Sequence, residues 1–282
     1  MNGEIILGID LGGTNIRGGI VKDNSLQKIV SQKINSKASF DEVLKEAFIF
    51  IDQLFNSSVK AIGIGVPGLV SNGVVFDVVN IPSWEKIFLQ QLMQQRYSVP
   101  VFINNDANCF ALGEFYFGKG KNSDSMIGLS IGTGLGSGII INKKLYEGKN
   151  CGAGEFGMID YLDHSYEYYA SGQFFQNVYG ISGDVVFHNA SQQNGDAIKM
   201  LEAFGMHLGN AIKTILYALD VELIVLGGSV SNAFSLFSKT MQQQVETFAY
   251  KKTIENLKIE VSELPHCGVL GAAALCYDTD SF

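Results

Sequence analysis

The chain has 282 residues and a formal net charge of −8, with 46% hydrophobic residues, 32 glycines and only 4 prolines. This length and composition are typical of a compact α/β protein with one large domain or two similar lobes, and they exclude a disordered chain. The acidic charge, without any dense cluster of Lys and Arg, argues against nucleic acid or an anionic membrane as a partner.

The cysteines and the N-terminal segment indicate the cellular compartment of the protein. Four cysteines are scattered without the spacing of a metal site: Cys109, Cys151, Cys267 and Cys276. Such a pattern is typical of reduced thiols in a cytosolic protein. No basic-then-apolar leader precedes Glu4, and no apolar run approaches membrane-spanning length. We therefore expect a cytoplasmic protein with no membrane partner.

The first stretch, residues 5–21, predicts a β-hairpin with a glycine turn. An apolar run with Asp10 as its only charge is followed by Gly12-Gly13-Thr14 and by a second apolar run. Paired glycines at a tight turn are kept mainly where φ is positive or where another group approaches the backbone closely. The turn would then hold a phosphate, and Asp10 would hold Mg²⁺ directly or through water. A purely structural hairpin fits this stretch equally well.

The next segments predict a strand, a helix and a second strand. After a strand over 26–34, apolar residues at helical spacing indicate an amphipathic helix that begins near Phe40 and is capped by Ser39. A buried strand over 59–66 ends in Pro67-Gly68. Because open α/β sheets bind ligands at the carboxyl ends of their strands, Gly68 lies at a candidate ligand edge.

A strand-to-helix junction follows with three polar residues. Strands are expected over 74–79 and 100–103, with a helix from about 85 to 96 between them. The second strand ends in Asn104-Asn105-Asp106, and 107–117 continues as a helix. A carboxylate at such a junction can face a cleft. Asp106 also fits a simple helix N-cap, and the two roles are compatible.

The opening pattern returns as a weak internal repeat. An apolar strand over 126–131 is followed by the turn Gly132-Thr133-Gly134 and by a second strand over 139–142. The repeat predicts two lobes of common plan, each with a phosphate-type turn, and a cleft between them.

Two nucleotide-binding motifs are excluded. The glycine turn that starts at Gly132 is no dinucleotide fingerprint, because Ser137 stands at the third glycine position and the turn leads into a strand. The stretch 113–119 is no P-loop, because Gly120 stands where Ser or Thr must bind Mg²⁺ and because a predicted helix precedes the stretch.

The remaining chain completes the second lobe. A long insertion over 148–196 is expected before regular structure resumes with a buried helix over 199–219. A core strand over 222–226 ends in Gly227-Gly228, and a small-residue helix over 268–277 would pack closely against a sheet.

Four motifs occur in a fixed order along the chain: Asp10-Leu11-Gly12-Gly13-Thr14, Asn105-Asp106, Gly132-Thr133-Gly134 and Leu226-Gly227-Gly228. With them the chain resembles the ROK family (repressors, open reading frames, kinases) of the hexokinase and actin-like ATPase superfamily. The similarity runs from about residue 4 to 275, and it also includes Gly154-Glu155-Phe156-Gly157, Glu167, Tyr169-Ala170-Ser171-Gly172 and Gly271-Ala272-Ala273.

The resemblance implies an α/β fold of two ribonuclease-H-like (actin-like ATPase) lobes, whose cleft closes over ATP and a sugar. The N-terminal lobe is expected over 1–117, completed by the C-terminal helix 268–282. The C-terminal lobe is expected over 118–267, with its insertion at 148–196. The implied reaction is transfer of the γ-phosphoryl group to a hydroxyl of a hexose or N-acetylhexosamine, commonly the 6-hydroxyl.

The resemblance also implies roles for single residues. Asp106 is the implied catalytic base, which suits phosphoryl transfer because that reaction needs in-line positioning, charge neutralisation and a carboxylate to accept the hydroxyl proton. Asp10 is the implied Mg²⁺ ligand. The implied sugar contacts are Gly68, Asn80, Asn105, Asp106, Glu155 and Glu167. The implied nucleotide and phosphate contacts are Asp10, Gly12, Gly13, Thr14, Gly132, Thr133, Gly134, Gly227 and Gly228.

The chain departs from the family pattern at the zinc motif. Many members follow Gly-Glu-x-Gly with His and a cysteine-rich zinc motif, whereas Met158 stands at the His position and 159–166 contains no cysteine. His164 alone cannot make a structural zinc site, which needs about four ligands. We therefore expect no structural zinc. The missing His also removes a donor near the sugar, so glucose specificity cannot be transferred to this chain.

A sugar kinase is the first functional hypothesis, because the metal, phosphate and base positions are all present. A repressor of the same family is disfavoured, since those proteins carry an N-terminal helix-turn-helix and here the first strand starts near Glu4. The remaining alternative is a catalytically weak sugar-sensing protein, with which the altered zinc region is compatible, although the retained Asp106 argues against it. The acceptor sugar, the donor (ATP or polyphosphate) and the oligomeric state stay open; a homodimer is the family-level expectation.

Overall fold

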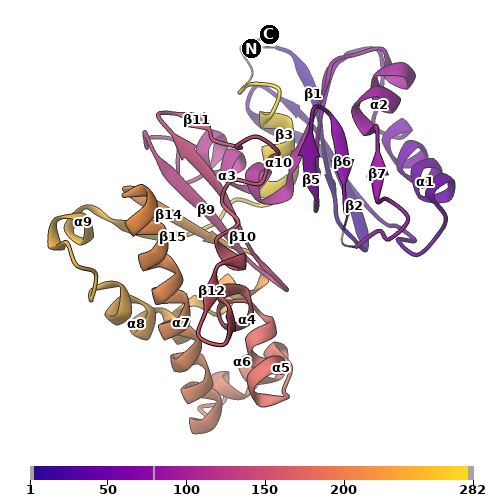
Figure 1. The fold of residues 1–282 in the computed structure, drawn as a ribbon. Helices are drawn as coiled ribbons and strands as arrows, with labels where there is room; N and C mark the ends of the chain where they lie inside the picture. Colours follow the sequence, from indigo (N-terminus) through magenta and orange to yellow (C-terminus); the bar gives the residue numbers. More distant parts are fainter. Residues whose placement is uncertain (1–2, 79, 279–282) are drawn as a thin grey trace. The chain divides into compact units, whose positions relative to one another are not determined.

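The computed structural model describes residues 3–78 and 80–278 (Figure 1). The described chain divides into two compact units. Unit 1 comprises the chain up to Asp124, Gly138–Ala153 and the residues from Glu263 on, and unit 2 comprises Ser125–Ser137 and Gly154–Ser262.

The central sheet of unit 1 has five strands in the order β3-β2-β1-β4-β8. They are β1 (Ile5–Leu11), β2 (Asn15–Lys22), β3 (Ser25–Lys33), β4 (Val59–Val66) and β8 (Val101–Asn105). The first three are antiparallel neighbours, whereas β1, β4 and β8 run parallel. The hairpin predicted over 5–21 is therefore confirmed, and the carboxyl ends of β1, β4 and β8 meet at one edge of the sheet.

Helices cover both faces of this sheet (Figure 1). They are α1 (Phe40–Asp52), α2 (Leu89–Tyr97), α3 (Asp106–Phe117) and α10 (Cys267–Ala274). The adjacent strand residues Gly18 and Gly19 point to opposite faces. A Cβ at Gly18 would meet Phe50 of α1 at 2.8 Å, and one at Gly19 would meet Val269 of α10 at 2.9 Å. Helices α1 and α10 thus cover opposite faces of the sheet at β2, whereas the edge strand β3 has no buried residue.

A small three-stranded sheet completes the early part of unit 1. Its strands are β5 (Leu69–Ser71), β6 (Val74–Phe76) and β7 (Lys86–Ile87). The strand expected over 74–79 is shorter in the structure, and Val79 lies outside the described residues. The helix expected from about 85 starts only at Leu89, because Lys86 and Ile87 pair with β6 instead.

Part of the expected C-terminal lobe packs within unit 1. Residues 118–124 and 138–153 belong to unit 1, whereas the expected C-terminal lobe covers 118–267 without a break. Strand β10 (Leu135–Ile141) crosses the boundary at Gly138, and its end pairs with β11 (Lys144–Leu145). The reason is close packing, since a Cβ at Gly138 would lie 2.6 Å from the carbonyl oxygen of Ala107 in α3. Of the expected C-terminal helix 268–282, residues 279–282 lie outside the described chain.

Unit 2 contains a parallel sheet in which β14 lies between β9 and β15. These strands are β9 (Met126–Ile131), β14 (Leu223–Gly227) and β15 (Lys258–Val261). The helices are α4 (Tyr166–Ala170), α5 (Gln173–Tyr179), α6 (Gly183–Ser191), α7 (Gly195–Leu219), α8 (Phe234–Val245) and α9 (Lys251–Asn256), with the 3₁₀ turns η1 (Phe156–Met158) and η2 (Ser229–Ala233) and the hairpin strands β12 (Asp160–Tyr161) and β13 (His164–Ser165). Both units therefore combine sheets with helices, which confirms the predicted α/β class.

The insertion expected over 148–196 is more regular than predicted. It holds α4, α5 and α6, which have 5, 7 and 9 residues. Helices this short show little 3.6-residue periodicity, so the pattern missed them. Buried aromatic packing stabilises them instead: the rings of Phe174 and Phe175 in α5 lie 5.9 and 5.5 Å from the ring of Phe204 in α7. Within the described ranges, no helix is both long enough and apolar enough to span a bilayer.

Candidate functional site

The carboxyl edge of the unit 1 sheet brings two predicted acidic residues onto neighbouring elements. Asp10 lies near the end of β1, in register with Gly65 of β4, and Gly65 is in register with Asn104 of β8. Asp106 follows as the first residue of α3. A Cβ at Gly65 would lie 3.8 Å from the Asp106 Cα, so the start of α3 sits directly on β4. Asp10 and Asp106 therefore share one edge of the sheet.

The Asp10 carboxylate is partly buried and lies close to a positive charge. Its Oδ2 lies 3.6 Å from the Arg17 guanidinium, and its side chain is 23% exposed. Burial raises the pKa of Asp10 above its ordinary value, and the positive charge of Arg17 partly offsets this. A Cβ at Gly268 would lie 3.0 Å from the same oxygen, so α10 starts beside the carboxylate, where a helix N-terminus stabilises an anion. One accessible carboxylate suits Mg²⁺, which keeps most of its waters.

The turn 12–14 is shaped by a close neighbour. Gly12 N–H donates to the Asn15 carbonyl at 2.9 Å, and the Thr14 hydroxyl accepts from Asn15 Nδ2 at 3.1 Å. A Cβ at Gly13 would lie 2.0 Å from the Cβ of Asn80. Neither turn glycine has a positive φ. Glycine is therefore needed at 13 because the Asn80 side chain approaches the backbone, which also brings a predicted sugar contact to the predicted phosphate turn.

At the junction between β8 and α3, Asn105 and not Asp106 caps the helix. The Asn105 Oδ1 accepts from the Ala107 N–H at 2.8 Å, and its Nδ2 donates to the Gly68 carbonyl at 3.3 Å. Asp106 Oδ1 also accepts from Ala107 N–H, at 2.9 Å, and the Asp106 side chain is exposed. The structure therefore brings the predicted sugar contacts Gly68 and Asn105 together and leaves the Asp106 carboxylate in the first turn of α3. The N-cap role considered for Asp106 was wrong.

Unit 2 holds the second glycine turn, which is braced by α4 and α5. Gly132 N–H donates to the Gly134 carbonyl at 3.0 Å, and the Gly132 carbonyl accepts from Gly172 N–H at 2.7 Å. Gln173 Nε2 donates to the Thr133 carbonyl at 2.8 Å. The stretch between α4 and α5 thus fixes the shape of the turn.

Glu167 of α4 lies on this same turn. Its Oε2 accepts from the Leu135 N–H at 2.9 Å, and a Cβ at Gly134 would lie 2.6 Å from it. A predicted sugar contact and a predicted phosphate turn therefore meet within unit 2. Only a residue without a side chain fits at 134 while the carboxylate keeps this position.

The glycines predicted to contact the adenosine end of ATP lie beside the second glycine turn. Gly227 ends β14 in register with Ser130 of β9. Gly228 has a φ of +84°, and a Cβ there would lie 2.3 Å from the Ile131 carbonyl oxygen. Both observations require glycine at 228. The structure thereby brings the loop after β14 against the end of β9, where the turn begins at Gly132.

Glu155, the N-cap residue of η1, has an altered acidity. Burial first, and then the negative charge of Glu167, raise the pKa of Glu155 above its ordinary value of 4.5. The two implied sugar-binding carboxylates of unit 2 are thus close enough to repel each other.

This pair predicts how stability changes with pH. A carboxyl whose pKa is raised by folding holds its proton more tightly in the folded state, so the free energy of unfolding falls as pH rises through the raised pKa. Glu155→Gln cannot ionise, so we expect it to lose less stability than the wild type between about pH 4 and about pH 7. Urea denaturation at both pH values measures this. Glu202→Gln, an exposed change on α7, is the control; a Glu155→Gln curve parallel to the wild type would contradict the prediction.

Two residues that support these loops, Glu147 and Gln173, have no signal in the sequence, and Asn104 is predicted only as a polar residue of the strand-to-helix junction. Asn104 and Glu147 bond each other in unit 1, and Gln173 braces the turn in unit 2. The contacts join residues 43 and 40 positions apart, so no local pattern signalled them. No group of three or more His, Cys, Asp or Glu side chains in the described ranges is placed to hold a metal ion. The expected absence of structural zinc stays a prediction.

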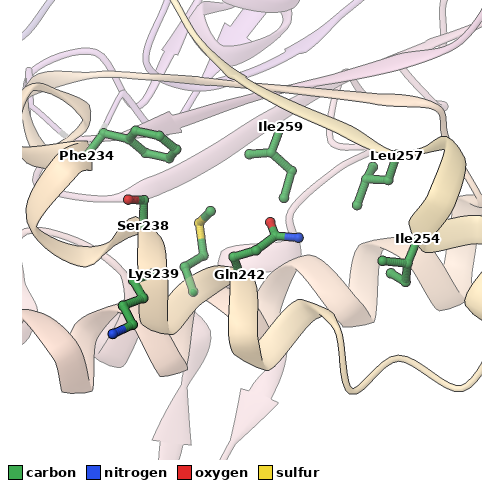
Figure 2. Close-up of a pocket in the computed structure, with 8 residues that line it drawn as sticks. Phe234, Ser238, Lys239, Gln242, Ile254, Leu257 and Ile259 are labelled. Carbon is green, nitrogen blue, oxygen red and sulfur yellow. The ribbon is translucent and has the colours of Figure 1, made fainter.

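A pocket elsewhere in unit 2 contains none of the predicted site residues. Figure 2 shows its lining side chains, which come from α8 and from the segment of α9 and β15. They are Phe234, Ser238, Lys239, Met241, Gln242, Ile254, Leu257 and Ile259. Both apolar and polar side chains line this hollow, and because none of the predicted site residues is among them, the hollow is not part of the candidate site.

The fold, together with glycine turns and carboxylates at strand ends, defines a protein of the actin-like ATPase class. The family model described as ROK family matches residues 6–279, and the chain therefore belongs to the ROK family. The crystal structure of a ROK family glucokinase from Streptomyces griseus in complex with glucose and AMPPNP is 25% identical, with a TM-score of 0.81, and the match covers 96% of this chain and 98% of that one.

Relatives with curated names have different functions. The chain is 25% identical over 309 residues to a glucokinase from Thermotoga maritima, covering 96% of each chain. It is 29% identical over 295 residues to the xylose repressor of Bacillus subtilis, covering 96% of this chain and 77% of the repressor. The family thus includes both kinases and repressors among the proteins similar to this chain.

Proposed function

We propose that this protein transfers the γ-phosphoryl group of ATP to a hydroxyl of a hexose or N-acetylhexosamine, with the 6-hydroxyl as the expected acceptor. The observation that carries the proposal is the junction between β8 and α3. There Asn105 caps the helix, and Asp106 keeps an exposed carboxylate in the first turn. A general base must be within hydrogen-bond reach of the hydroxyl proton that it accepts, and its exposure supports this role for Asp106 because a sugar bound at the strand end could approach the carboxylate.

The other residues of unit 1 would bind and orient the substrates. The sugar hydroxyls would contact Asn105, Gly68 and Asn80. Asn105 is hydrogen-bonded to the Gly68 carbonyl, and the Asn80 side chain packs against Gly13 of the first glycine turn. The N–H groups of the turn and the Thr14 hydroxyl would bind phosphate oxygens. Asp10 would hold Mg²⁺ directly or through water, and the ion would neutralise phosphate charge.

Unit 2 would supply the remaining groups. Glu155 and Glu167 would accept hydrogen bonds from sugar hydroxyls. The turn 132–134 would bind phosphate through its backbone. Gly227 and Gly228 would accommodate the adenosine end, since Gly228 lies against Ile131, the residue just before this turn. Loss of any one binding group is expected to raise KM more than it lowers kcat.

A sugar-sensing protein with little or no turnover is the second candidate. The similarity to a xylose repressor favours it, because that relative covers 96% of this chain. Met158, which is 59% exposed, also stands where many family members have His, so one donor near the sugar is absent.

Turnover with a panel of sugars distinguishes these candidates. Purified protein with Mg·ATP is assayed for ADP release against hexoses and N-acetylhexosamines, and in parallel with polyphosphate as donor. We expect one sugar to stimulate ADP release above the sugar-free rate. Binding is followed by fluorescence of Trp84, the single tryptophan of the chain. It is fully buried and follows Asn80 by four positions. A sugar that changes this fluorescence without turnover from either donor would contradict the kinase and support the sensor.

A further inference from the structure

Glu147 lies outside every motif of the sequence analysis, yet it contacts the β8–α3 junction within unit 1. Its Oε2 accepts a hydrogen bond from Asn104 Nδ2 at 2.5 Å and another from Cys151 Sγ at 3.4 Å. The Asn104 side chain is 3% exposed. A hydrogen bond from a buried carboxamide to a carboxylate is stronger than one between neutral groups. Glu147 is therefore a strong partner for a residue that the protein buries.

Asn104 connects this carboxylate to the junction. Its Oδ1 accepts from the Asn105 N–H at 2.8 Å and from Asn108 Nδ2 at 2.8 Å. A carboxylate only accepts hydrogen bonds, so Glu147 requires the Asn104 amide nitrogen on its side. If the Asn104 carboxamide were flipped, its Oδ1 would face the Glu147 carboxylate, so two acceptors would meet. Its Nδ2 would face the Asn105 N–H, so two donors would meet. Glu147 thus fixes which end of Asn104 faces the backbone of Asn105.

The segment that carries Glu147 is itself held in place. The Glu147 carbonyl accepts from the Ala153 N–H at 3.2 Å, and Gly148 turns the chain with a φ of +70°. A Cβ at Gly152 would lie 3.3 Å from Leu69 Cδ2. Leu69 directly follows Gly68, whose carbonyl accepts from Asn105. The segment 147–153 therefore packs against the chain on both sides of the Gly68 to Asn105 contact.

We propose that Glu147 is a positioning residue for the phosphoryl transfer. Through Asn104 it holds the backbone at Asn105 and hence the start of α3, where the Asp106 carboxylate stands. The inference rests on the proposed function, because the position of Asp106 affects turnover only if this carboxylate takes the proton. A displacement of about 1 Å at a reacting group can cost about 10²-fold in rate.

Swapping the two bonded groups tests the proposal. Asn104→Asp alone places two carboxylates against each other, and kcat is expected to fall by about tenfold or more while KM for ATP changes little. Glu147→Gln added to Asn104→Asp restores an amide-to-carboxylate bond of reversed direction, and we expect kcat to return to within about threefold of the wild type. Lys149→Gln, an exposed change on the same segment, is the control, with no expected loss.

Amide hydrogen exchange gives a readout that does not depend on turnover. Exchange of the Asn105 N–H, followed by NMR, is expected to be faster in Glu147→Ala than in the wild type and to slow again in the double variant. A double variant as impaired as Asn104→Asp in both measurements, or an unchanged exchange rate in Glu147→Ala, would overturn the proposal. If the wild type shows no sugar-dependent ADP release, the proposed function fails, and the exchange rates still decide whether Glu147 holds the junction.

Discussion

Asp106→Asn is expected to lower kcat by about 10²- to 10⁴-fold while KM for the sugar changes little. The carboxamide has nearly the same shape as the carboxylate but cannot accept a proton from the sugar hydroxyl. The fold is expected to persist, because Asn105 caps α3 independently through its bond to Ala107. Steady-state ADP release with the sugar identified by the panel measures the effect.

The matched control for this variant is Asp41→Asn. Asp41 also stands in the first turn of a helix of unit 1, and it is exposed. Both variants remove one negative charge from a helix N-terminus, so both lose the same favourable interaction with the helix dipole. We expect Asp41→Asn to retain full kcat. An Asp106→Asn enzyme with more than about a tenth of the wild-type kcat would contradict the role of Asp106 as general base.

Gly63→Ala is expected to lower the free energy of unfolding by about 3 kcal/mol or more. A Cβ at this position of β4 would lie 1.8 Å from the Ala272 carbonyl oxygen of α10. The clashing atom belongs to the backbone of a helix, so no rotation of a side chain relieves it. Either α10 moves away from the sheet or the strand shifts. Urea denaturation and the melting temperature measure the loss.

Gly195→Ala provides the comparison for this stability effect. Gly195 is the first residue of α7, and a Cβ there would meet no atom within 4 Å. Alanine favours a helix over glycine by up to about 1 kcal/mol, so we expect this variant to be as stable as the wild type or slightly more stable. If Gly63→Ala unfolded at the same urea concentration as Gly195→Ala, the close packing of α10 on β4 would be disproved.

Local sequence patterns predicted those parts of the fold that depend on interactions between residues close together in the chain. The hairpin over 5–21 and the junction at Asn105 follow from apolar alternation and from polar residues that end a strand, and the structure has both. The family resemblance, carried by four short motifs, is confirmed over residues 6–279. These features depend on residues close together in sequence, so a single chain is sufficient to find them.

Other parts of the site depend on contacts between distant residues. The glycine at 13 is explained by Asn80, which lies 67 positions further along the chain and packs on it, and not by a positive φ. Glu147 looks like any exposed loop acid until the structure places it on Asn104. Ring contacts join the short helices α4 and α5 to α7 and join α6 to α5, and helical periodicity does not predict such contacts. The roles implied for the site residues stay predictions until the variants are measured.

The place of α10 has a consequence for how the protein is made. The helix comes from the last part of the chain, yet it covers β1 and β4, the strands that carry Asp10 and Gly65, and it starts beside the Asp10 carboxylate. A ribosome releases the chain from the N-terminus onward. At least 200 further residues must therefore be synthesised after these strands before the helix that covers them can form. Until then one face of an apolar sheet is open to water and to chaperones. A chain cut short before Cys267 is therefore expected to be an aggregating fragment, because unit 1 can complete its fold only after α10 has been synthesised.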